Sequence, residues 1–215
     1  MFCSLNGNRV TSLTLVKPQL GCAFADVTLD DVVRFATPAV TLVLAGLTVT
    51  ATVLRSGDFT GATQARIVAG RGGWSQEIPE RFYQNPFGLK LSPILMDAAS
   101  AVGEALIIDT DRTVGQFYVR ERAVAARTLN QLAGGWWVQN DGVTHVGLRP
   151  APTVASQFDV VSADLGIGRV TIATDKPEDW EPGCFFAAPT ITRRQASAVI
   201  HRVSRDGLRT ELWTS

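Results

Sequence analysis

The glycine-rich stretch of residues 69–74 is the part of this sequence most like a phosphate-binding loop. Its closely spaced glycines, Gly70, Gly72 and Gly73, would let several backbone N–H groups approach an anion. A phosphate loop ends in Lys followed by Ser or Thr and leads into a helix, and this stretch has neither feature. We therefore interpret it as a turn or bulge that follows a strand.

The chain has only two histidines, His145 and His201, as candidates for a general base. Neither has a sequence neighbour that marks it as the base of a nucleophilic Ser or Cys, and no Gly-x-Ser-x-Gly motif occurs. Both lie in predicted strands, which favours partly buried or interface histidines. We predict no catalytic residues and a protein that is not an enzyme.

Acidic residues cluster at Asp30-Asp31 and in residues 175–181. Paired carboxylates could transfer protons or hold Ca²⁺. The calcium-loop pattern of alternating Asp or Asn around a central Gly is missing, and Pro177 interrupts the second cluster. We predict an exposed loop there.

Metal ligands are sparse, because the three cysteines fit no zinc or redox spacing and the two histidines add little. Each cysteine stands among apolar or small residues, so we predict buried thiols, no metal site and no cofactor. A disulfide would form only if the fold brought two of them together. The cysteines are Cys3, Cys22 and Cys184.

The charge balance, 20 basic against 20 acidic residues, argues against sequence-specific nucleic acid binding and against an anionic membrane surface. A hydrophobic content of 46% is ample for a core. The most apolar stretch, residues 39–54, is broken by threonines and Gly46 and is too short to span a bilayer. The first ten residues lack a signal-peptide pattern, so we expect the protein to be made and assembled in the cytoplasm.

Three segments differ in hydrophobic periodicity. Residues 1–77 alternate as strands with Gly, Asn and Asp turns, including hairpins around residues 6–8 and 45–46. Residues 78–150 contain two helical patterns, which begin at Ser92-Pro93 and at residue 123, and a hairpin through 140–142.

Residues 151–215 return to the strand pattern and close with a hairpin at 205–207. The order predicts an α+β, mainly β fold in which N- and C-terminal strands form a β-barrel or sandwich. The middle segment would be an insert of two helices and a hairpin.

Large aromatic residues remain without a chemical role. Residues 81–87 are aromatic, interrupted by Pro86, and fit neither helix nor strand, which suits an ordered interface loop; a loop packed on its own domain is the alternative. Trp74 and the pair Trp136-Trp137 could instead stack on sugar rings. We predict a set of partner contacts made of Phe82, Tyr83, Phe87 and Trp137.

Three stretches together resemble the baseplate-hub and tail-tip proteins of tailed bacteriophages, the group that includes the late-control gene D proteins. They are the opening with Asn6-Gly7 and residues 10–13, the middle block 91–150, and the ending 182–212. The middle block is similar to a hub element in which a helix-led segment ends in a Trp-bearing strand, here Trp136-Trp137-Val138, and an Asp-Gly hairpin.

The resemblance implies a structural protein of the virion tail tip. Such a protein would form a homo-oligomeric ring, a trimer, that ends the tail tube. Its implied partners are the tail tube or distal tail protein, the tape measure, and fibre or spike proteins. The iron–sulfur ligands of some tail-tip proteins are missing, since the cysteines are too few. A carbohydrate- or receptor-binding module at the tail tip is the alternative, and a hydrolase with an unrecognised site is a third.

Overall fold

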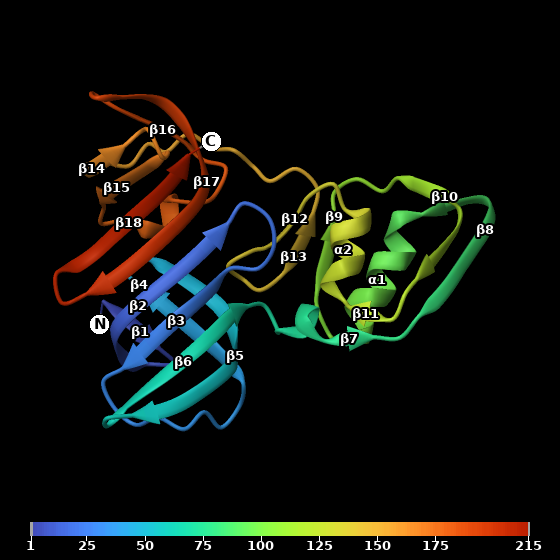
Figure 1. The fold of residues 1–215 in the computed structure, drawn as a ribbon, viewed down its shortest axis with the longest axis horizontal. Coiled ribbons are helices and arrows are strands. Elements are labelled where there is room, and N and C mark those ends of the chain that lie inside the picture. Colours follow the sequence, from blue (N-terminus) through green and yellow to red (C-terminus); the bar gives the residue numbers. More distant parts are fainter. Residues whose placement is uncertain (1, 215) are drawn as a thin grey trace.

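The computed structural model describes residues 2–214, which form three parts in chain order (Figure 1). A β-barrel comes first, an elongated insert with two helices extends from it, and a second β-sheet ends the chain. The insert leaves the barrel after residue 69 and returns near residue 147, so its two connections run close together.

Six strands close the barrel. They follow the order β1-β4-β5-β6-β3-β2, and pairing between β1 and β2 completes the circle. Closure leaves these strands without an open side, apart from the edge that β2 offers to the C-terminal sheet. The strands are β1 (Cys3–Leu5), β2 (Asn8–Pro18), β3 (Phe24–Leu29), β4 (Ala39–Leu44), β5 (Leu47–Phe59) and β6 (Ala62–Ala69).

Alternation of side chains explains the barrel core. In β4, Val40, Leu42 and Leu44 are buried while the residues between them are more exposed, because successive strand residues point to opposite faces. The turn to β5 places Ala45 at φ 49° and is followed by Gly46, as the predicted hairpin requires.

The C-terminal strands continue the same sheet, because β17 pairs with β2 from Leu13 to Pro18. Their own apolar core surrounds the fully buried Trp180 and Phe186. The short helical turn η2 (Pro177–Asp179) precedes this core. The strands are β14 (Asp159–Asp164), β15 (Arg169–Ala173), β16 (Phe185–Ala188), β17 (Ile191–Ser204) and β18 (Gly207–Thr214).

The insert packs its two helices side by side, with a two-stranded ribbon of β8 and β10 beyond them (Figure 1). Ile94, Leu95 and Ala98 of α1 and Leu129 of α2 are fully buried. The elements are η1 (Gly73–Ser75), β7 (Glu77–Ile78), β8 (Arg81–Lys90), α1 (Leu91–Ala101), β9 (Leu106–Ile108), β10 (Thr113–Arg120), β11 (Ala123–Val124), α2 (Ala126–Leu132), β12 (Trp136–Val138) and β13 (Thr144–Val146).

The predicted mainly β fold with a two-helix and hairpin insert is confirmed. Three local expectations differ from the structure. The second helix begins at Ala126 and not at residue 123, because Ala123 and Val124 pair with β7 as strand β11. The stretch 81–87 is a strand and not a loop, since β10 pairs with it. The first helix begins at Leu91, one residue before the predicted start. Its second residue, Ser92, donates hydrogen bonds from its backbone N and its Oγ to the carboxylate of Asp111, which lies outside the helix.

Candidate interaction surface

The glycine-rich loop already holds an anion, which is the side chain of Glu104. Gly73 N donates to Glu104 Oε1 at 2.6 Å, and Arg71 N donates to Oε2 at 3.3 Å. Gly70 and Gly72 adopt φ of 84° and 77°, so the backbone can turn around this carboxylate. Glu104 is buried, and its carboxylate occupies the place that a phosphate would need.

Replacing Glu104 by Ala is expected to lower the free energy of unfolding by about 1–3 kcal/mol, because buried N–H groups lose a charged acceptor. Urea denaturation measures this. Glu80→Ala is the matched control, since Glu80 is exposed and forms no ion pair within residues 2–214. Equal effects of the two substitutions would contradict this role of Glu104.

The two histidines are built into the fold. His145 stacks on Trp137, with ring centroids 5.4 Å apart and planes 13° apart. His201 is fully buried, and its Nδ1 lies 3.0 Å from Thr210 Oγ1. Burial, and to a lesser extent the charge of Lys17, lowers the pKa of His201 to about 3. This imidazole is neutral at pH 7 and has no access to a substrate.

The thiols are also unreactive. Burial raises the pKa of Cys3 and Cys22 to about 12 and that of Cys184 to about 11, and the three cysteines are unpaired. Thiolate, the nucleophilic form, is therefore scarce at neutral pH. No cluster of three or more metal-ligating side chains occurs within residues 2–214. In the same range, no helix has the length and apolar character needed to cross a bilayer.

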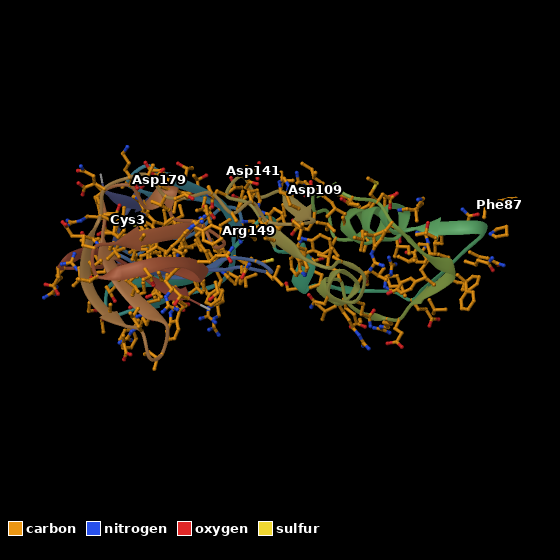
Figure 2. The ribbon with its side chains drawn as sticks, turned by 90° about the horizontal axis from the view of Figure 1, so that it is seen from above. Cys3, Phe87, Asp109, Asp141, Arg149 and Asp179 are labelled. Carbon is orange, nitrogen blue, oxygen red and sulfur yellow. The ribbon has the colours of Figure 1, made fainter. Side chains whose placement is uncertain are left out.

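A buried charge cluster joins the three parts of the molecule. Glu181, before β16, pairs with Lys17 on β2 through Oε1 and with Arg149 through Oε2 at 2.9 Å. Asn140, in the turn between β12 and β13, donates to Glu181 Oε1 at 2.9 Å. Figure 2 shows Arg149 between the insert and the rest of the chain.

The environment of this cluster is unusual for charged groups. Only 3% of the Lys17 side chain and 10% of the Arg149 side chain are exposed. Burial lowers the pKa of Lys17, and the Glu181 carboxylate opposes that shift. The predicted exposed loop at 175–181 is therefore wrong for Glu181, which is half-buried, and for Trp180, which is fully buried.

The β8–β10 ribbon presents an apolar outer face. Phe82 lies opposite Val119, and Phe117 lies opposite Gln84, so these side chains share one face. Phe82 is 60%, Phe117 69% and Val119 55% exposed. Phe87, in the distal half of β8, is 98% exposed, and Figure 2 shows it at the far end of the molecule.

The inner face of the ribbon is fixed to α1. Tyr83 donates its hydroxyl to Asp97 Oδ2 at 2.6 Å, and Arg120 Nη1 donates to the same oxygen at 2.7 Å. Arg81 completes the cluster around Asp97. Burial of Tyr83 and its bond to Asp97 raise the pKa of this tyrosine. The outer face is thus held in place while its phenylalanines remain uncovered.

The four predicted contact residues fall into different settings. Phe82, Tyr83 and Phe87 lie on the same strand, but Tyr83 points inward to Asp97. Trp137 lies on β12, is only 4% exposed and stacks on His145, so it offers no free surface in this chain. Phe117 and Val119 were not predicted, although the alternation in residues 113–120 could have indicated them.

Comparison with solved structures identifies the fold. The chain is similar to the tail protein from Neisseria meningitidis MC58, with a TM-score of 0.68 and 14% identity over 99% of this chain and 95% of that one. It is also similar to the Escherichia coli c3393 protein, with a TM-score of 0.70 and 9% identity over 99% of this chain and 76% of that one. That protein is a component of the type VI secretion system and is structurally similar to the T4 bacteriophage tail proteins gp27 and gp5.

A third similar structure is the prophage MuSo2 tail protein from Shewanella oneidensis, with a TM-score of 0.66 and 9% identity over 99% of this chain and 96% of that one. No protein-family model and no curated protein sequence matches this chain. The resemblance to phage tail proteins is confirmed at the level of the fold, which extends over the barrel, the insert and the C-terminal sheet.

Proposed function

We propose that this protein is a structural subunit of a phage tail tip or baseplate hub, which forms a ring that ends the tail tube and anchors tip or fibre proteins. The likeness to tail proteins over 99% of the chain is the observation that carries the proposal. The full burial of His201 and the raised pKa of the three thiols are consistent with a structural and not a catalytic role.

The proposal extends to organisation and place. The ring is a trimer in the virion tail, assembled in the host cytoplasm, and its neighbours are the tail tube or distal tail protein, the tape measure and fibre or spike proteins. Residues 1–77 and 151–215 form the β body of each subunit, and residues 78–150 form its extension. Phe82 and Phe87 contact a partner directly, whereas Tyr83 and Trp137 support such contacts from within.

The sugar-binding alternative requires exposed tryptophan rings, and the three tryptophans that suggested it are buried. Trp74, Trp136 and Trp137 are 3%, 7% and 4% exposed, so none of them presents a ring face on which a sugar could stack. We therefore put no second function beside the structural one.

The test is the mass of the purified chain, measured by light scattering with sedimentation velocity up to millimolar concentration. A closed ring gives one discrete mass that is a small multiple of 23.1 kDa. A chain that stays monomeric over the whole range, or that binds host surface glycans with ordinary lectin affinity, would overturn the ring proposal.

A further inference from the structure

The barrel and the C-terminal sheet are joined by strand pairing but have separate apolar cores. The pairing of β2 with β17, from Leu13 to Pro18 on β2, is the junction between them. One core fills the barrel and the insert, and the other surrounds Trp180. From the C-terminal sheet, Val203 and Leu208 belong to the barrel core. Opening this junction therefore breaks few apolar contacts, because each part keeps its own core.

Polar side chains fill the buried side of the junction. Lys17 of β2, His201 of β17 and Thr210 of β18 are 2%, 0% and 0% exposed. His201 lies opposite Leu15, and Lys17 follows two residues farther along the same face of β2. The imidazole and the ammonium group are therefore diagonal neighbours across the pairing. A polar layer thus lies between the two apolar cores.

The contacts of His201 suit a neutral ring. Its Nδ1 lies 3.0 Å from Thr210 Oγ1. Its Nε2 is buried and has no hydrogen-bond partner among residues 2–214. A protonated imidazole carries N–H on both nitrogens, so one of them would be buried without an acceptor, near the positive charge of Lys17. The closed junction therefore disfavours the protonated form.

The buried acidic group of the junction is already engaged. Glu181 pairs with both Lys17 and Arg149, so one carboxylate faces two buried cations. Cys184 also acts on Lys17, but burial raises the pKa of this thiol to about 11 and keeps it neutral at pH 7. A proton on His201 would add a third positive charge without adding a counter-charge.

The other charged residues close to His201 in β17 and β18 lie on the opposite face of the sheet. Arg202 follows His201, and Arg209 and Glu211 flank Thr210, so alternation turns all three away from the buried side. Arg202 donates to Glu211 at 2.6 Å, and its side chain is 47% exposed. This outer ion pair therefore does not compensate a charge on the imidazole.

We propose that the β2–β17 junction opens in acid, when protonation of His201 separates the C-terminal sheet from the barrel while each part keeps its core. In the open form the imidazole reaches water and binds a proton as an ordinary histidine does. Opening also bares the edge of β2, with which a strand of another chain can pair. The inference concerns the single chain and does not depend on the proposed ring.

The sign of the pH dependence follows from His201. Its pKa is about 3 in the closed form and returns to the ordinary 6.5 in the open form. The stability that the neutral ring gives to the closed junction is therefore complete above pH 6.5 and is lost as the pH falls towards 3. Each pH unit within this window favours opening by a factor of about ten.

Amide hydrogen exchange of the full chain, followed residue by residue by nuclear magnetic resonance at pH 7 and pH 4.5, tests the opening. After correction for intrinsic exchange rates, the opening constant of the amides that join β2 to β17 is expected to rise roughly a hundredfold at pH 4.5. At that pH, the amides of the β4–β5 and β15–β18 pairings are expected to keep opening constants at least about ten times lower, because both cores remain folded.

Two variants assign the effect to one histidine. His201→Gln cannot titrate, so the opening constant at the junction is expected to change by less than about threefold between the two pH values. His145→Gln is the matched control, because it makes the same chemical change on β13 of the insert, and it should retain the hundredfold rise. If His201→Gln does not fold by circular dichroism, the pH profile of the wild type decides. It should be flat above pH 6.5 and rise with a slope of one proton below it.

The remaining outcomes contradict the inference. An opening constant at the junction that is the same at pH 7 and pH 4.5, or that rises as much in His201→Gln as in the wild type, overturns it. Equal opening constants for the junction, the β4–β5 pairing and the β15–β18 pairing at pH 4.5 also overturn it, since the chain then unfolds as one unit. None of these results bears on the ring, which the mass of the purified chain decides.

Discussion

Replacing Glu181 by Gln is expected to lower the free energy of unfolding by about 3–5 kcal/mol, because Lys17 and Arg149 would then be buried without a counter-charge. The carboxylate is the only acidic partner of both side chains among the described residues. Since Lys17 lies on the barrel and Asn140 in the insert, the loss would also loosen the connections between the three parts. Urea denaturation measures the first effect and limited proteolysis near residues 69–77 and 147–152 the second.

Glu178→Gln is the matched control, since it makes the same chemical change three residues away. Glu178 is exposed and forms no ion pair within residues 2–214, so its substitution should change stability by less than about 0.5 kcal/mol. Lys17→Met should be milder than Glu181→Gln, because it removes a buried charge and leaves Glu181 paired with Arg149. If Glu181→Gln and Glu178→Gln are equally stable, the cluster does not hold the three parts together.

Mild acid is expected to destabilise the protein through His201. Its pKa is about 3 in the folded chain and 6.5 as the ordinary value, so the unfolded chain binds a proton between these limits and the folded chain does not. Stability therefore falls as the pH is lowered from 6.5 towards 3, by about 1.4 kcal/mol for each pH unit. Above pH 6.5 this histidine adds no pH dependence.

The acid effect can be separated from that of the carboxyl groups. Hydrogen bonds and nearby arginines or serines keep the pKa of Asp26, Asp97 and Asp111 below the ordinary 3.8, so their contribution is lost only at lower pH. Urea denaturation at pH 7 and pH 4.5 should show a loss of about 3 kcal/mol for the wild type, and a much smaller one for His201→Gln. Nuclear magnetic resonance provides a readout without a variant: a ring proton of His201 that titrates near pH 6 would contradict the prediction.

Elements defined by local turns were predictable from the sequence. The hairpins at Gly46, at Asp141-Gly142 and at Asp206-Gly207 all form, because each turn places two alternating segments next to each other in the chain. The ribbon was not predictable in this way. Pro86 lies within β8 where the pairing register with β10 shifts, and β10 follows in the chain only after α1 and β9.

The polar contacts that fix the parts were hidden for a similar reason. Lys17 and Glu181 are 164 residues apart, and Gly73 and Glu104 are 31 residues apart, so no local spacing marks either pair. The burial of Trp137 was also unpredictable. Strand alternation indicates that Trp136 and Trp137 point to opposite faces, but it does not indicate that His145 covers the face with Trp137. The glycine-rich stretch was interpreted as a turn or bulge, and the contacts of its backbone N–H groups with Glu104 were not predicted.

The pairing of β2 with β17 has a consequence for synthesis of the chain on the ribosome. Thr14 and Arg202, which lie side by side across this pairing, are 188 residues apart. At roughly 5–20 residues per second, the edge of β2 waits about 10–40 s for the strand that covers it. The barrel can close during that interval, since its six strands lie within residues 3–69. Until residues 198–203 have been made, each nascent chain therefore carries one bare edge on a folded barrel, where neighbouring nascent chains can pair with it.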